Sequence, residues 1–94
     1  MEVKLGEIVL SKAGRDKGSF FVVMSIDGDY VQICDGRKRK IDSMKRKKIK
    51  HLSLGIGHSD YIEGKLSSGH KVTNSEIRRE LDEYSSASYS EGEC

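Results

Sequence analysis

The sequence predicts a small, mainly β domain, either a barrel or a sandwich, followed by one amphipathic helix. The chain has 94 residues, which is enough for a single domain. Its first half contains short apolar runs about ten residues apart, each bounded by glycine. Near the C-terminus the apolar residues instead follow the spacing of a helix.

The expected strands lie in the first half of the chain, at residues 7–11, 20–26, 30–34 and 49–54. The second run is rich in β-branched and aromatic residues, as strands usually are. It is followed by Asp27-Gly28, a dipeptide that favours a tight hairpin turn. Short strands at this spacing favour a barrel or a sandwich over a parallel sheet, and a barrel also protects its edges.

The second half changes character and predicts helices. Residues 55–58 contain two glycines and predict a flexible joint, and residues 60–63 have the spacing of a capping box, which Gly64 weakens. Residues 73–76 form a better capping box, followed by Ile77, Leu81 and Tyr84 at helical spacing. We therefore expect a barrel over 1–54, a flexible or short helical connection over 55–72, an amphipathic helix packed on the barrel over 73–84, and a disordered polar tail over 85–94.

Charge is distributed unevenly along the chain. The formal net charge is +2, but residues 1–52 hold thirteen Lys and Arg against seven Asp and Glu, whereas residues 53–94 hold four against eight. Residues 37–50 contain nine basic residues and one acid, Asp42. A cluster of this density neutralises phosphates and releases condensed counterions, so it indicates a polyanionic partner. The alternative is a solvated charged loop that only keeps the protein soluble.

The composition argues against several other classes of protein. No apolar stretch is long enough to span a membrane, and the first residues do not resemble a signal peptide. The two cysteines, Cys34 and Cys94, do not make a disulfide framework, so we expect a cytoplasmic protein with reduced thiols. Membrane attachment through the basic run alone would be marginal.

Catalysis and metal binding receive little support from the sequence. The three histidines, His51, His58 and His70, are far apart and have no cysteine or carboxylate at metal-ligand spacing. Cys34 lies in a predicted strand and has no histidine arranged beside it, so we expect it to pack in the core. We therefore expect no enzyme activity, no metal and no cofactor.

A glycine loop between the first two expected strands is the second functional feature. Gly14 and Gly18 bracket Arg15, Asp16 and Lys17, so the backbone can turn sharply and present amides and cations outward. The loop lacks the pattern of a phosphate-binding P-loop. On spacing alone, an ordinary strand connection in which Asp16 caps the turn is an equal alternative.

Residues 6–23 resemble a KOW motif, the strand–loop–strand element of a family of ribosomal and transcription proteins. The core Ala-Gly-Arg-Asp-Lys-Gly at 13–18, followed by Phe-Val-Val at 21–23, is most similar to small bacterial KOW-domain RNA-binding proteins and to KOW proteins of the archaeal and eukaryotic large ribosomal subunit. Segments 35–39, 45–52 and 73–78 are also similar to the bacterial group, so the resemblance covers about residues 3–84. The sequence departs from the family at Phe21, where many KOW motifs have glycine, and at Met44, where the bacterial group often has proline.

The resemblance implies a five-stranded SH3-like barrel that binds structured RNA, most often ribosomal RNA, in the ribosome or in translation. It implies that Gly14, Asp16 and Gly18 shape the KOW loop while Arg15 and Lys17 face the RNA. Together with the basic run, the expected RNA-binding residues are Lys12, Arg15, Lys17, Arg37, Lys38, Arg39, Lys40, Lys45, Arg46, Lys47, Lys48, Lys50 and His51.

The sequence alone leaves open the roles of His51 and Tyr30 and one alternative function. His51 could contact phosphate or a base, or could be a partly buried core histidine. Tyr30 is the best candidate for base stacking, although packing is the slightly stronger expectation. The alternative function is an SH3-like protein-interaction module that docks a ribosomal or transcription partner through its barrel or its C-terminal helix.

Overall fold

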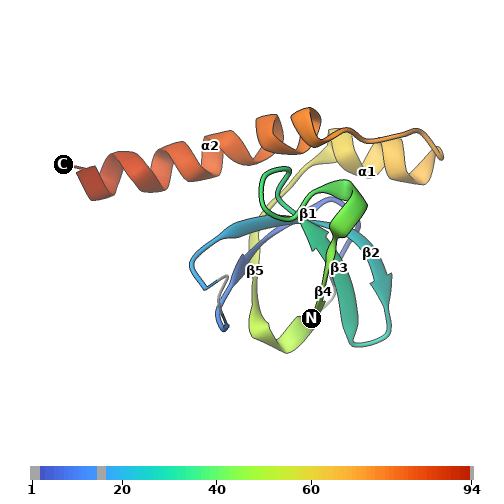
Figure 1. The fold of residues 1–94 in the computed structure, drawn as a ribbon, viewed down its shortest axis with the longest axis horizontal. Coiled ribbons are helices and arrows are strands. Elements are labelled where there is room, and N and C mark those ends of the chain that lie inside the picture. Colours follow the sequence, from blue (N-terminus) through green and yellow to red (C-terminus); the bar gives the residue numbers. More distant parts are fainter. Residues whose placement is uncertain (1–2, 15–16, 94) are drawn as a thin grey trace.

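The protein is a mainly β fold with two helices, seen in a computed structural model that describes residues 3–14 and 17–93, with side chains to residue 84 (Figure 1). Its elements are β1 (Glu7–Ser11), β2 (Phe20–Asp27), β3 (Tyr30–Cys34), the 3₁₀ turn η1 (Ile41–Ser43), β4 (Lys45–Lys48), the 3₁₀ turn η2 (Ile49–His51), β5 (Leu52–His58), α1 (Asp60–Ser67) and α2 (Asn74–Glu93). The strands form one antiparallel sheet in the order β4-β3-β2-β1-β5. Within the described residues β4 and β5 are its two edges, so the sheet is not closed.

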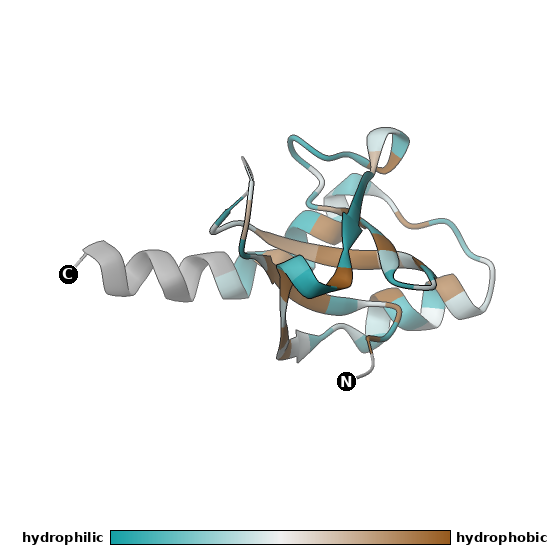
Figure 2. Cartoon of the chain, turned by 90° about the horizontal axis from the view of Figure 1, so that it is seen from below, coloured by the Kyte–Doolittle hydropathy of each residue, from teal (hydrophilic) through white to brown (hydrophobic). Residues whose placement is uncertain are grey.

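The core lies on both faces of this sheet, because successive side chains of a strand point to opposite sides. Phe21 and Val23 of β2 belong to one cluster, made with Val9, Val31, Ile33 and Leu52. Val22 and Met24 belong to the other, which includes Ile8, Cys34, Ile62, Val72, Ile77 and Leu81. The second cluster therefore joins the sheet to both helices, and Figure 2 shows the hydrophobic residues concentrated in the central strands.

The hairpin between β2 and β3 confirms the turn that was expected after residue 26, with a small shift in position. Asp27 and Tyr30 are paired, so the two turn residues are Gly28 and Asp29. Only Gly28 has a positive φ, 62°. Glycine at the first central position is the requirement of a type II′ hairpin turn, whereas the expected Asp27-Gly28 turn would need a positive φ at both positions.

The two edge strands were not predicted correctly. The basic run was expected to be a loop, but Lys45–Lys48 form β4, because their backbone pairs with β3 while long charged side chains can extend into solvent. The strand expected at 49–54 begins only at Leu52, after η2, and continues through the expected flexible joint to His58. Within this continuation Gly57 lets α2 pack closely on β5, because a Cβ at that position would lie 2.1 Å from the Tyr84 hydroxyl oxygen.

The first helix, α1, begins one residue earlier than its expected capping box. The Ser59 side chain accepts the hydrogen bond from the Ile62 amide at 3.1 Å, so Ser59 is the N-cap and Asp60 is the first helical residue. The Asp60 side chain therefore lies in the first turn, where its negative charge interacts favourably with the positive end of the helix dipole.

The second helix, α2, contains the helix that was expected near residues 75–84. Its capping box is confirmed, since Thr73 and Glu76 exchange reciprocal hydrogen bonds at 2.9 and 3.2 Å. Ile77 and Leu81 are 0% and 5% exposed and pack on the sheet. The helix then continues to Glu93, across a segment that was expected to be disordered. Its polar Ser and Glu residues carry only modest helix penalties, and the segment contains no proline.

None of the described helices is long and apolar enough to cross a bilayer.

Candidate nucleic-acid interface

The basic strand β4 divides its four cations between the two faces of the sheet. Arg46 and Lys48 pair with Gln32 and Tyr30 of β3. Lys45 and Lys47 pair with the buried residues Ile33 and Val31. Since directly paired residues share a face, Arg46 and Lys48 lie on the face of Tyr30, here called the outer face, and Lys45 and Lys47 lie on the face of the Val31 and Ile33 cluster, here called the inner face.

On the outer face, Tyr30 is covered by cations. The Arg46 guanidinium carbon lies 4.1 Å from the centre of the Tyr30 ring, and Lys48 Nζ lies 5.7 Å from it. Asp27 lies 4.0 Å from the same guanidinium, but both side chains are well exposed, so this ion pair contributes little. Because the Tyr30 ring contacts two cations, it helps to position their charges and leaves less of its own surface free to stack on a base.

On the inner face, Lys47 connects β4 to the glycine loop. Its Nζ donates a hydrogen bond of 3.2 Å to the carbonyl oxygen of Ala13. The same Nζ lies only 3.3 Å from the position that a Cβ of Gly14 would occupy. The ammonium of Lys47 is therefore engaged within the protein, and it holds the basic strand and the glycine loop together.

The described part of the glycine loop turns at two glycines with positive φ. Gly14 and Gly18 have φ values of 78° and 89°, which L-residues rarely adopt. Hydrogen bonds from the Lys17 amide to Gly14 and from the Gly18 amide to Ser11 close the turn. Lys12 and Lys17 are exposed. Arg15 and Asp16, expected to contact RNA and to shape the loop, lie outside the described residues.

A second basic loop, residues 35–40, is held by two separate anchors. The first is Asp35, whose Oδ1 accepts hydrogen bonds from the amides of Arg37 and Arg39 at 2.8 and 2.9 Å. The second is the start of α2, where Arg78 donates to the Gly36 carbonyl and Asn74 accepts from the amide of Ile41. Arg37, Lys38 and Lys40 are exposed, and Arg39 is half-buried. The loop thus presents cations on a fixed backbone.

The last two candidates, Lys50 and His51, lie in η2 and are exposed. The exposure of His51 excludes the alternative of a partly buried core histidine. Its backbone carbonyl accepts a hydrogen bond of 2.9 Å from the amide of Lys12, which joins η2 to the end of β1. The lysine and histidine side chains therefore lie beside the base of the glycine loop.

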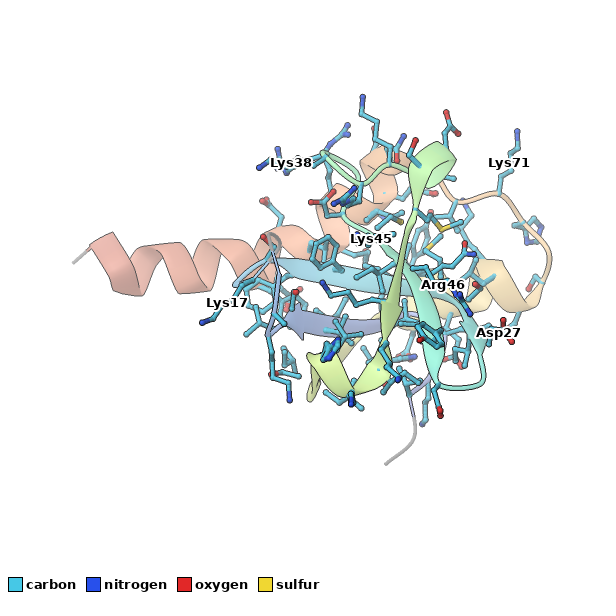
Figure 3. All side chains as sticks on the ribbon, turned by 60° about the horizontal axis from the view of Figure 1, so that its bottom comes forward. Lys17, Asp27, Lys38, Lys45, Arg46 and Lys71 are labelled. Atoms are coloured by element: carbon cyan, nitrogen blue, oxygen red, sulfur yellow. The ribbon has the colours of Figure 1, made fainter. Side chains whose placement is uncertain are left out.

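The candidate residues do not all lie on one side of the molecule. Lys17 and Lys38 project from the side on which α2 extends, whereas Arg46 lies across β4, next to Asp27 (Figure 3). Sequence reasoning missed Arg78, which anchors the loop from a position 42 residues away. No local pattern could have revealed it, because the contact depends on how α2 packs on the sheet.

The pKa values of Cys34 and Glu76 are shifted, and the surroundings of each side chain explain the shift. Burial, followed by the charge of Asp35, raises the pKa of the Cys34 thiol to about 12, so this thiol is a poor nucleophile. Hydrogen bonds from Lys65, Tyr61 and the Thr73 backbone lower the pKa of Glu76 to about 2, which fits its role in the capping box.

No protein-family model and no curated protein sequence matches this chain. The KOW resemblance therefore depends on the sequence segments alone.

Proposed function

We propose that this chain is a non-catalytic RNA-binding protein with an SH3-like, KOW-type fold, which binds structured ribosomal RNA in the ribosome or in translation. The phosphate backbone would be held by the exposed cations of the glycine loop, the 35–40 loop and η2. Cytoplasmic location and the absence of a cofactor are part of the same proposal.

The observation that carries this proposal is the hydrogen bond from Lys47 to Ala13, at 3.2 Å. It joins the basic strand to the glycine loop that carries Lys17, so charges that are distant in the sequence lie on neighbouring segments of the fold. Cations arranged in this way can match the fixed phosphate spacing of folded RNA, whereas a solvated charged loop would bind folded and unfolded strands alike. Among the side chains that the structure describes, Tyr61 is the exposed aromatic residue, which favours recognition of shape and backbone over stacking on bases.

The alternative function, a protein-interaction module that docks through α2, has less support. Ile77 and Leu81, the residues that would form its apolar contact, are already buried against the sheet. A partner would have to displace them from the core or use another surface.

Fluorescence anisotropy with three nucleic acids tests the proposal. The full chain is titrated into a folded ribosomal RNA fragment, a DNA duplex of equal length and an unstructured RNA, each at several salt concentrations. We expect the tightest binding to the folded RNA, with affinity falling steeply as salt rises. Equal and weak binding to all three would overturn the proposal, because it would mean that the cations act only as a diffuse positive charge.

A further inference from the structure

Three oxygen atoms surround the imidazole of His58, where β5 ends and α1 begins. Nδ1 lies 3.0 Å from Oδ1 of Asp60. Nε2 lies 3.0 Å from Oε1 of Glu63 and also 3.0 Å from the carbonyl oxygen of Leu5. The imidazole, Asp60 and Glu63 form a group whose potential ligand atoms all lie within 4.8 Å of one another.

A neutral imidazole does not satisfy this arrangement by itself. It carries one N–H, and the other nitrogen presents a lone pair. If Nδ1 donates to Asp60, the lone pair of Nε2 faces two further oxygen acceptors, which repel it. Either a proton on Nε2 or a metal cation between Nε2 and the two oxygens removes this conflict. Ligand atoms held at about 2.0–2.2 Å from one zinc ion lie roughly 3–3.5 Å from each other, and the 3.0 Å separations of Nε2 from the Glu63 and Leu5 oxygens are at the short end of this range.

We propose that a transition-metal cation, best matched by Zn²⁺, binds at this junction. Its protein ligands are Nε2 of His58, Oε1 of Glu63 and the carbonyl oxygen of Leu5. Asp60 accepts the hydrogen bond from Nδ1, which is the usual partner that orients a metal-binding histidine. A mixed nitrogen and oxygen set favours zinc over magnesium or calcium, which prefer oxygen ligands.

Backbone hydrogen bonds fix the segments that carry the three ligands. The amide of Ser59 donates to the Gly6 carbonyl, and the Gly6 amide donates to Val23, each at 2.8 Å, so the segment that carries Leu5 is fixed to both β2 and the start of α1. A Cβ at Gly6 would lie 2.7 Å from the Ser59 carbonyl oxygen, so only glycine permits this approach. Glu63 follows in the first turns of α1, whose N-cap is Ser59.

The site is open to solvent on one side. The side chains of His58 and Glu63 are 28% and 40% exposed. This exposure leaves a coordination position for water and an entry path for the ion. A bound metal would tie the N-terminal segment, β5 and α1 together, so the consequence for the protein is added stability at the place where the helices join the sheet.

The experiment is a zinc titration of the full chain without a histidine tag, followed by calorimetry and by NMR of the histidine side-chain nitrogens. We expect one Zn²⁺ per chain, a large change in the Nε2 resonance of His58, and no comparable response to MgCl₂. Glu63→Gln should weaken zinc binding at least tenfold, and Asp60→Asn by about 10–100-fold, as is typical of the orienting partner. His70→Gln, which changes an exposed histidine outside the site, should bind zinc as the wild type does.

Two results would overturn the inference. One is a His58 ring that carries protons on both nitrogens and does not respond to zinc, which would identify the arrangement as an ion pair with an imidazolium. The other is zinc binding that is unchanged in Glu63→Gln. Because the NMR measurement is made on the wild-type chain, it decides the question even if a variant fails to fold. Neither result bears on RNA binding, which is tested separately.

Discussion

The guanidinium of Arg78 donates a 2.7 Å hydrogen bond from Nη1 to the backbone carbonyl of Gly36, and so fixes a basic loop of the sheet to the C-terminal helix. A Cβ at Gly36 would lie 2.6 Å from the carbonyl oxygen of Asn74, so the loop and the helix are in direct backbone contact. The order of this loop therefore depends on α2.

Replacing Arg78 by Met tests this anchor, because Met keeps the apolar stem and removes the charged donor. We expect a loss of about 1–2 kcal/mol in the free energy of unfolding, as for a partly buried hydrogen bond to a charged group. Amide exchange in residues 35–40 should also become faster. Arg79→Met is the control, since Arg79 is exposed, and it should change stability by less than about 0.5 kcal/mol. Unchanged exchange in the loop would contradict the role of Arg78.

Gly57→Ala should destabilise the protein because the new methyl group would meet the Tyr84 side chain. Overpacking of this kind usually costs about 1–3 kcal/mol. The same substitution combined with Tyr84→Ala should cost less than the sum of the two single changes, which urea unfolding can measure as a double-mutant cycle. Gly64→Ala is the matched control, since a Cβ there meets nothing within 4 Å. It lies inside α1 and should stabilise by about 0.5–1 kcal/mol.

Glu76 should make stability fall at acid pH. Its hydrogen bonds lower its pKa from the ordinary 4.5 to about 2, so the folded state favours the ionised form. The corresponding stabilisation is present above pH 4.5 and is lost as the pH falls from about 4.5 to 2. Urea midpoints measured across this range should decline less steeply in Glu76→Gln than in the wild type. If the exposed control Glu83→Gln flattened the decline equally, the effect would not belong to Glu76.

Cys34 should resist thiol reagents in the folded protein. Its side chain is fully buried, and burial raises its pKa to about 12, so the reactive thiolate is scarce at pH 8. In a Cys94→Ser background, which leaves one thiol, we expect modification by a disulfide reagent to occur only at the rate of unfolding and to become rapid in urea. Fast modification without denaturant would show that the thiol is accessible in the native state.

The sequence predicted those parts of the fold that depend on local chemistry. The hairpin after β2 follows from glycine in the turn, and the start of α2 follows from the reciprocal bonding of Thr73 and Glu76. The burial of Ile77 and Leu81 follows from their helical spacing. In each case the residues that determine the structure lie within a few positions of one another.

The features that the sequence did not predict depend on distant contacts. The strand β4 consists of four cations with little preference for a strand, and it forms because β3 offers an unpaired edge. The close packing of Tyr84 of α2 on Gly57 of β5 joins two residues that are far apart in the sequence. The grouping of His58 with Glu63 and Leu5 requires the N-terminal segment to return beside α1. The expectation that no carboxylate lies at metal-ligand spacing from a histidine was wrong, because Asp60 and Glu63 place carboxylate oxygens beside His58.

The candidate RNA-binding residues were also predictable only in part. Their positive charge was evident from composition, but their distribution over two faces depends on the register between β3 and β4. That register commits Lys47 to an internal hydrogen bond and leaves the cations of the 35–40 loop exposed. The most informative substitutions are therefore in that loop.

The central claim is that particular exposed cations contact RNA phosphates, and two double variants of equal charge test it most directly. Arg37→Ala with Lys38→Ala removes two cations from the proposed surface, and Lys4→Ala with Lys71→Ala removes two exposed cations elsewhere. The measurement is the dependence of affinity for the folded RNA on salt concentration, for the wild type and both variants. We expect the log–log slope to fall by about 1.5–2 in the first variant and to stay at the wild-type value in the second. Equal changes in both variants would contradict the claim, because binding would then depend on net charge and not on this surface.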